Sequence, residues 1–255
     1  YQRFEEMFGH LIFDKLELLD KKETAVVVRN VAELAAFDHT LEFAKEFGVT
    51  SITASKVKRA VKSNLKTLKK LPSLEEIIKN IMRGSNFVSE HSLLLSYISG
   101  QICMATSWGS PATLEKLSMA AMLHDCYFEN DELAKLHDQG KVDKKELSKE
   151  EYQKILDHPG EAAKLISSGE SIFPDVDTIV LQHHEKPDQS GYPRGLGSLS
   201  ISPLSCIFIV AEDYVHHIIG KKPEEIDKEL LKKDFVEKYS KGNFKKVIGA
   251  FQKVF

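Results

Sequence analysis

Apolar residues recur at helical spacing through most of this 255-residue chain. Residues 3–19 have the pattern clearly, with apolar side chains at positions 4, 7, 8, 11, 12, 16 and 19. Apolar residues three and four positions apart line one face of an α-helix, and that face must pack against other elements. A β-like run at residues 25–28 is too isolated to define a sheet. The pattern therefore predicts an all-α protein.

Local signals indicate where some of these helices begin and end. Ser148 followed by Glu151 is a capping box, in which each side chain bonds the backbone N–H of the other residue, and it predicts a helix to about residue 168. Residues 203–219 are strongly apolar and predict a buried helix. The polar stretch 129–147 is predicted as loop with short turns.

A change of character near residue 72 predicts two regions. Residues 1–72 carry no motif. We interpret them as a small, mainly helical N-terminal region that acts as a sensory, dimerisation or packing module. Within this region residues 55–70 are strongly basic, which most simply gives a solvated helix face. Residues 73–255 carry the remaining helices and all the motifs described below.

Composition limits what such a chain can do. The formal net charge of -3 argues against a protein that binds nucleic acid polymers, because such proteins are usually basic. No apolar run approaches the roughly 18 residues of a membrane span. No signal peptide is visible, and a chain that begins at Tyr1 is expected to be a fragment. Three cysteines without CxxC spacing suit a reducing compartment, so we expect a cytoplasmic location.

The most informative polar residues are histidines beside acids at the ends of apolar helices. His124 and Asp125 end one such helix, and His183, His184 and Glu185 end another. A carboxylate buried beside an imidazole is costly unless it is neutralised, and a metal cation neutralises it most simply. Imidazole and carboxylate ligands together suit iron, manganese, zinc or nickel.

Either dipeptide alone is weak evidence of a metal site, because such pairs often lie on a surface. The chain contains two internal controls. His137 and Asp138 repeat the first pair in a polar, glycine-containing stretch, and His216 and His217 repeat the histidine pair. Order and spacing along the chain distinguish the first set from these controls.

Several segments follow one another in a recognisable order. The most specific, HHEKPDQSGYPRGL, begins at His183, and EHSLLLSYIS, AAMLHDC, DHPGEAAKLI and IFIVAED support it. These segments resemble, over roughly residues 85–222, the HD-GYP family of cyclic di-GMP phosphodiesterases, a branch of the HD phosphohydrolases. Gln189 stands where that family usually has a glycine. The resemblance implies an HD-domain-like helical bundle over residues 73–255.

Carried over by position, the resemblance implies a site for two metal ions. Its seven ligand residues would be His91, His124, Asp125, His158, His183, His184 and Glu212. The residues at 91, 124 and 212 would hold one metal ion, those at 158, 183 and 184 the other, and the acid at 125 would bridge them. Asp213 is the neighbouring candidate for the acid at 212, because the chain reads V-A-E-D where the family has V-A-D.

The resemblance also implies a reaction and its partners. The expected reaction is hydrolysis of a cyclic dinucleotide phosphodiester, cyclic di-GMP to pGpG or GMP. Two divalent cations ~3.5–4 Å apart would share the attacking hydroxide, so no protein nucleophile is needed. Asp125 would act as the ligand that bridges the two cations. Iron is the metal expected first, with manganese as the alternative. The loop residues Gly191, Tyr192 and Pro193 imply recognition of GGDEF-domain proteins, although they could also simply shape a turn.

Departures from the family pattern at three positions bear on the expected activity and on the number of metal ions. Phe128 stands where the H-D-x-G-K motif has its lysine, which is expected to contact the substrate phosphate. Lys221 approximately matches an arginine that contacts substrate, and we expect it to bind substrate, but Glu224 stands near the next basic position. Phe87 stands where some members have a glutamate for a third metal, so we expect two metals.

Two alternatives stay open at the level of sequence. In the first, a catalytically weakened module binds cyclic di-GMP or docks a protein, with metals that are structural. In the second, the chain hydrolyses another nucleotide phosphoester, as other HD hydrolases do. Calorimetry of nucleotide binding distinguishes the first alternative from the leading interpretation, and a substrate panel with metal-loaded protein distinguishes the second.

Overall fold

The computed structural model describes residues 2–21, 25–70, 78, 81, 87–128, 131–138, 147–168, 174–221 and 223–255. These residues contain no strand, and one isolated bridge joins Asp188 to Gly197. The helices are α1 (Gln2–Lys21), α2 (Val26–Phe47), α3 (Ser51–Leu68), α5 (Phe87–Met104), α6 (Pro111–Leu123), α7 (Asp131–Asp138), α8 (Lys149–Ser167), α9 (Val176–Gln182), α10 (Pro203–Ile218), the short 3-10 helix η1 (Pro223–Glu225), α11 (Lys228–Lys238) and α12 (Phe244–Val254). The prediction of an all-α protein is confirmed.

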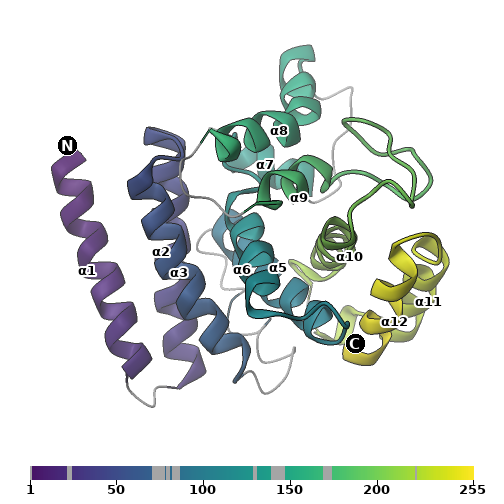
Figure 1. Cartoon of the computed structure of the whole chain (residues 1–255), viewed down its shortest axis with the longest axis horizontal. Helices are drawn as coiled ribbons and strands as arrows, with labels where there is room; N and C mark the ends of the chain where they lie inside the picture. The colour runs from purple at the N-terminus through teal and green to yellow at the C-terminus, as the bar shows by residue number, and fades with distance from the viewer. Residues whose placement is uncertain are drawn as a thin grey trace.

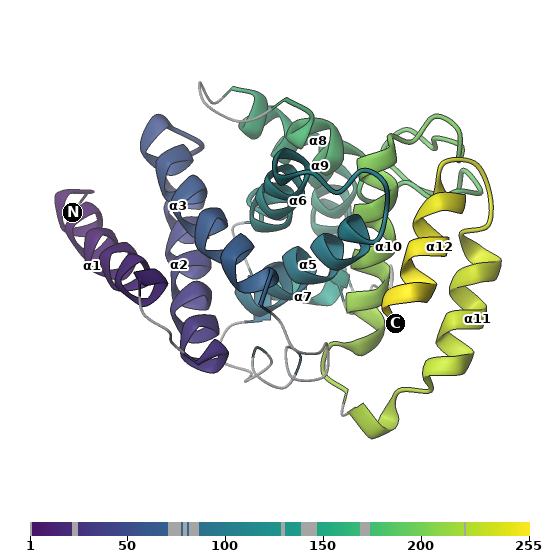
Figure 2. The same ribbon diagram turned by 60° about the horizontal axis from the view of Figure 1, so that its bottom comes forward.

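The helices are arranged around α5. Helices α1, α2 and α3 lie side by side at one end of the molecule, and α10, α11 and α12 lie at the other end (Figures 1 and 2). Helix α5 contacts α2 on one side and α6, α10 and α12 on the others. Every residue from 88 to 100 is buried, which is the pattern of a helix surrounded by other helices.

Two local predictions are confirmed. The Glu151 N–H donates to Ser148 Oγ at 3.2 Å, and the Ser148 N–H donates to the Glu151 carboxylate at 2.9 Å, so the capping box opens α8. The buried helix predicted over residues 203–219 is α10. Among the helices that the structure describes, none combines the length and the apolar character that crossing a membrane requires.

Two other local predictions are wrong. The β-like run opens α2, with Val27 and Val28 39% and 48% exposed. Helix α2 turns polar side chains inward instead, and packing overrides the weak local preference of valine for strands. Part of the loop predicted over 129–147 is α7, where Leu133 and Ala134 are buried in the core. The boundary predicted between residues 72 and 73 lies outside the described residues.

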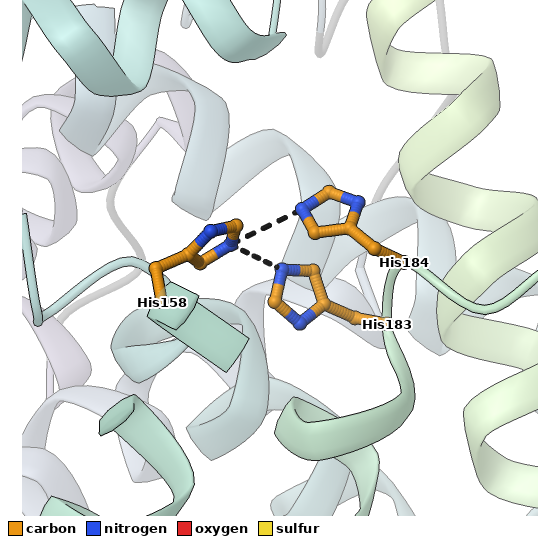
Figure 3. Close-up of side chains that lie close together, drawn as sticks. All are labelled: His158, His183 and His184. Atoms are coloured by element: carbon orange, nitrogen blue, oxygen red, sulfur yellow. Dashed lines mark hydrogen bonds between the residues drawn. The ribbon is translucent and has the colours of Figure 1, made fainter. Parts of the chain in front are cut away.

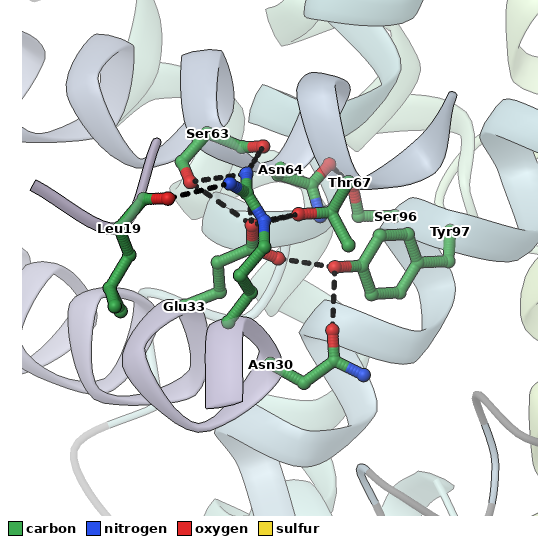
Figure 4. Close-up of polar contacts among 9 residues, drawn as sticks. Leu19, Asn30, Glu33, Ser63, Asn64, Thr67, Ser96 and Tyr97 are labelled. Carbon is green, nitrogen blue, oxygen red and sulfur yellow. Dashed lines mark hydrogen bonds and ion pairs between the residues drawn. The ribbon is translucent and has the colours of Figure 1, made fainter. Parts of the chain in front are cut away.

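The inward face of α2 forms a buried polar network with α3 and α5 (Figure 4). Arg29 Nη2 lies 3.8 Å from Glu33 Oε1, and Arg29 Nε donates to Thr67 Oγ1 at 2.9 Å. The hydroxyls of Thr67 and of Tyr97, on α5, both donate to the Glu33 carboxylate. Burial raises the pKa of Glu33, while these hydrogen bonds and Arg29 oppose the rise. The network therefore keeps an acid inside a helical interface.

Further polar contacts tie the N-terminal helices to α5 and α6. On α3, Asn64 Oδ1 accepts from Ser96 of α5 at 2.8 Å and from Ser118 of α6 at 3.1 Å. On α2, Asp38 accepts from Ser89 of α5 at 2.9 Å. The helices of the N-terminal region thus pack directly against the two helices that lead to His91 and to His124.

Removing one member of the buried ion pair should destabilise the protein. We expect Arg29→Met to lower the free energy of unfolding by about 3 kcal/mol, because Glu33 loses its buried cation. Urea denaturation followed by circular dichroism measures the change. The control is Arg59→Met, since Arg59 pairs with Asp14 and Glu17 where these acids are 68% and 55% exposed. We expect that variant to lose less than about 1 kcal/mol; equal losses would contradict a special role for the buried pair.

Candidate metal centre

Three histidines from α8 and the end of α9 meet at one point (Figure 3). His158 lies in α8, and His183 and His184 directly follow α9. His158 Nε2 is 3.0 Å from His183 Nε2 and 3.1 Å from His184 Nε2. His158 and His183 are buried, and His184 is half-buried. Residues that are 25 and 26 positions apart in the sequence thus direct their ring nitrogens at a common position.

The backbone fixes the orientation of three of the buried imidazole rings. Each holds its Nδ1 against the carbonyl oxygen of the residue three positions earlier: His124 on Ala121, His158 on Ile155 and His183 on Val180. A carbonyl oxygen only accepts hydrogen bonds, so Nδ1 carries the hydrogen and Nε2 of the neutral ring presents its lone pair. This is the arrangement in which protein histidines bind metal ions.

A second cluster joins α5, the end of α6 and α10. His91, His124 and Glu212 are all buried, and each contributes one possible ligand atom to a set whose members lie within 4.8 Å of one another. The Asp213 carboxylate is not a member of this set, and it accepts from Lys238 Nζ and from the Tyr239 hydroxyl, each at 2.8 Å. Of the two neighbouring acids, the structure therefore brings Glu212 to the histidines.

Asp125 lies between the two clusters. Its Oδ2 is 3.3 Å from Nε2 of His124, in one cluster, and its Oδ1 is 3.5 Å from Nε2 of His158, in the other. Its side chain is only 2% exposed. The two carboxylate oxygens thus face different clusters, which is the geometry that a bridging ligand requires.

The donor set fits two transition-metal cations. The Nε2 atoms of His158 and His183 lie 3.0 Å apart, and two lone pairs at this distance repel each other unless a proton or a metal cation joins them. Burial holds the pKa of His183 well below its usual value, and the neighbouring rings of His158 and His124 add to this effect. Neutral imidazoles and ionised carboxylates in a buried cluster are the ligands that iron, manganese and zinc take in proteins.

The loop after the histidine pair is built onto the centre. The buried Glu185 carboxylate accepts the backbone N–H of Arg194 at 2.8 Å and that of Leu196 at 2.7 Å. The Tyr192 ring stacks on His184, with centroids 4.9 Å apart and planes 23° apart. The loop with Gly191, Tyr192 and Pro193 therefore braces a candidate ligand directly, as well as shaping a turn.

A cavity of about 220 Å³ opens beside the two clusters. His183, His184 and Glu212 line it, together with Lys186 from the loop and Lys238 from the end of α11. A larger groove of about 540 Å³ lies between α1 and α3, but its lining includes one carboxylate and no histidine. The smaller cavity is therefore the one that adjoins a possible metal site.

The departures from the family pattern have defined positions. Phe128 is buried, and its ring lies 4.6 Å from the ring of His158, so it packs against a candidate ligand. Phe87 stacks on His91 with centroids 6.1 Å apart. Lys221 is exposed beyond the end of α10 and is not among the residues that line the cavity, so its contact with substrate stays a prediction.

Sequence reasoning missed two residues of this site. His216, treated as half of a control pair, stacks on His91 with centroids 5.3 Å apart and lines the cavity. The signal was its spacing, since residues four apart such as Glu212 and His216 share a helix face. Glu185 was seen only as part of the motif, although it holds the loop. His217, the other half of the pair, is exposed.

Comparisons with known proteins identify the family of the chain. A family model described as HD domain matches residues 72–230. The chain is 28% identical over 167 residues to a cyclic di-GMP phosphodiesterase of Thermotoga maritima, and the aligned region covers 61% of this chain and 43% of that protein. It is 30% identical over 99 residues to the cyclic di-GMP phosphodiesterase response regulator RpfG of Xanthomonas campestris pv. campestris. That aligned region covers 35% of this chain and 26% of that protein. The chain thus spans less than half the length of the curated relatives it matches.

A solved structure shares the fold. Bd1817, an HDG"Y"P protein from Bdellovibrio bacteriovorus, matches with a TM-score of 0.65 over 91% of this chain and 74% of that chain, at 16% identity. At this identity the likeness concerns the fold alone. It confirms the predicted HD-domain-like helical bundle.

The close packing of the loop gives a testable expectation. A Cβ at Gly191 would lie 2.3 Å from the backbone nitrogen of Lys186 and 2.5 Å from the backbone carbonyl oxygen of His184. Gly191→Ala should therefore lower the free energy of unfolding by about 2 kcal/mol. The control is Gly160→Ala in α8, two residues after His158, where a Cβ meets nothing within 4 Å. We expect that control to gain up to about 1 kcal/mol. Urea denaturation compares them, and a Gly191→Ala protein of wild-type stability would refute the close approach.

Proposed function

The chain belongs to the HD domain family, in its HD-GYP branch, and from this membership we propose that it hydrolyses a cyclic dinucleotide phosphodiester at a two-metal site. The proposed substrate is cyclic di-GMP and the products are pGpG or GMP. The names of the two curated relatives support the substrate class. Because the chain spans less than half of those relatives, the activity and the substrate are proposals for this chain.

One observation carries the proposal. Seven residues within or directly after α5, α6, α8, α9 and α10 converge as two largely buried clusters with a carboxylate between them. We propose that one metal ion is held by His91, His124 and Glu212 and the other by the residues at 158, 183 and 184, with Asp125 shared. Burying these imidazoles and carboxylates together costs free energy, and a purely structural role would not offset that cost.

The chemistry divides between the metals and the chain. Bound cations would supply a water-derived nucleophile at neutral pH and would neutralise charge on the phosphate oxygens. The chain's own contribution is orientation, because backbone carbonyls hold the rings of His124, His158 and His183 with Nε2 directed at the clusters. Phe128 and Phe87 pack on candidate ligands and exclude water from their apolar sides.

The metal and the partners are also part of the proposal. Five imidazoles and two carboxylates suit iron, with manganese as the alternative. The family resemblance supports docking of GGDEF-domain proteins on the loop of Tyr192, where Pro193 and Arg194 are exposed. A cytoplasmic location is supported by three buried cysteines that form no disulfide.

Metal content tests the ligand assignment independently of activity. We expect two metal equivalents in the wild-type protein, about one in His91→Ala and in His158→Ala, and fewer than one in Asp125→Ala, because the shared ligand serves both ions. Inductively coupled plasma mass spectrometry on folded, gel-filtered protein measures the metal equivalents. The control is His10→Ala, an exposed histidine on α1 that should leave both equivalents in place. Two equivalents in His158→Ala would contradict the assignment.

Turnover tests the reaction itself. Iron- or manganese-loaded wild-type protein should convert cyclic di-GMP to pGpG or GMP, and Asp125→Ala should reduce the rate by about 100-fold or more. Chromatography of the products measures it, with other nucleotide phosphoesters in the same panel. Binding of cyclic di-GMP without turnover would indicate a binding module, and hydrolysis of a different ester would indicate another substrate. Either result would overturn the proposed reaction.

A further inference from the structure

The cavity beside the metal centre is lined by two lysines, and one of them lies outside every family motif described above. Lys238, at the last residue of α11, lines the cavity together with His183, His184 and Glu212. It lies beyond residue 230, where the match to the HD domain model ends. Lys186, from the loop after the histidine pair, is the other lysine among the described residues that line this cavity.

Lys238 is fixed in position by the cavity wall. Its Nζ donates to Asp213 Oδ2 at 2.8 Å, and the Tyr239 hydroxyl donates to the same oxygen at 2.8 Å. Asp213 directly follows Glu212 on α10, so the lysine is anchored one residue from a candidate metal ligand. An ammonium group has three N–H donors, and Asp213 accepts one of them. The side chain remains 42% exposed, so a ligand in the cavity has access to the ammonium.

A phosphodiester in this cavity would need a cation that the usual position does not supply. Phe128 stands in the lysine position of the H-D-x-G-K motif and is buried against His158. Lys221 does not line the cavity. Lys186 is exposed on the loop, whereas Lys238 is held by a carboxylate before a ligand arrives. A cation that is already fixed loses less conformational freedom on binding an anion.

We propose that Lys238, anchored by Asp213, is a phosphate-contact residue of this site and replaces the lysine missing at position 128. The inference rests on the proposed function, because it takes the substrate to be a phosphodiester bound at the two clusters. The competing interpretation is purely structural, with the Lys238–Asp213 pair only joining α11 to α10. A structural pair would affect stability, whereas a phosphate contact affects KM and the binding of phosphate.

Steady-state kinetics separates these interpretations. With metal-loaded protein and cyclic di-GMP, Lys238→Met should raise KM by about 10-fold or more, since it removes a charge-assisted hydrogen bond to the substrate. Metal content and kcat should change little, and Lys238→Arg should recover part of the loss. The control is Lys233→Met, an exposed lysine on the same helix, about 140° around the axis from position 238 at 3.6 residues per turn. An unchanged KM in Lys238→Met at full metal content would overturn the inference.

Binding of inorganic phosphate keeps this test separate from the proposed reaction. If the wild-type protein leaves cyclic di-GMP intact, the proposed function fails, but titration calorimetry of metal-loaded protein with inorganic phosphate still tests Lys238. Weaker phosphate binding in Lys238→Met than in Lys233→Met supports the contact. Equal phosphate affinity in the two variants refutes it.

Discussion

The buried carboxylate of Asp125 is the constraint on which the rest of the structure depends. It lies 2% exposed between the rings of His124 and His158, where a single negative charge would be unstable without cations. To surround it, the chain must bring α5, α6, α8, α9 and α10 to one point. The helical bundle can thus be understood as the scaffold that keeps two sets of imidazole nitrogens on either side of one acid.

The N-terminal helices contribute to that scaffold. The buried acid Glu33 binds Tyr97 on α5, and Asn64 binds Ser96 and Ser118, so α2 and α3 hold the helices that lead to His91 and His124. Polar groups buried between helices bond in defined directions, whereas apolar contacts permit sliding. A region without any recognisable motif therefore has a defined structural relation to the candidate site.

The departures from the family pattern follow from the same electrostatics. An aromatic ring at position 128 excludes water from His158, and the cavity obtains cations from Lys186 and Lys238 instead. The position that supplies positive charge thus shifts from the end of α6 to the end of α11. Asp213 accepts a hydrogen bond from the Lys238 ammonium group and anchors it. Positive charge thus remains beside the clusters, while Phe128, at the lysine position of the motif, is buried in the core.

The sequence by itself determined the helical class, the cap of α8 and the buried helix α10, and the order of its motifs predicted the candidate ligands, with position 212 or 213 left open. These features depend on local periodicity and on residue types in order, which the chain states directly. Only the tertiary structure decided that residues 26–28 are helical, that α2 buries Arg29 and Glu33, and that Glu212 rather than Asp213 joins the histidines. Adjacent residues on a helix point about 100° apart, so the packing of α10 against α5 chooses between the two acids. The same packing brings His216 onto His91, whereas the local spacing places His216 only on the same helix face as Glu212.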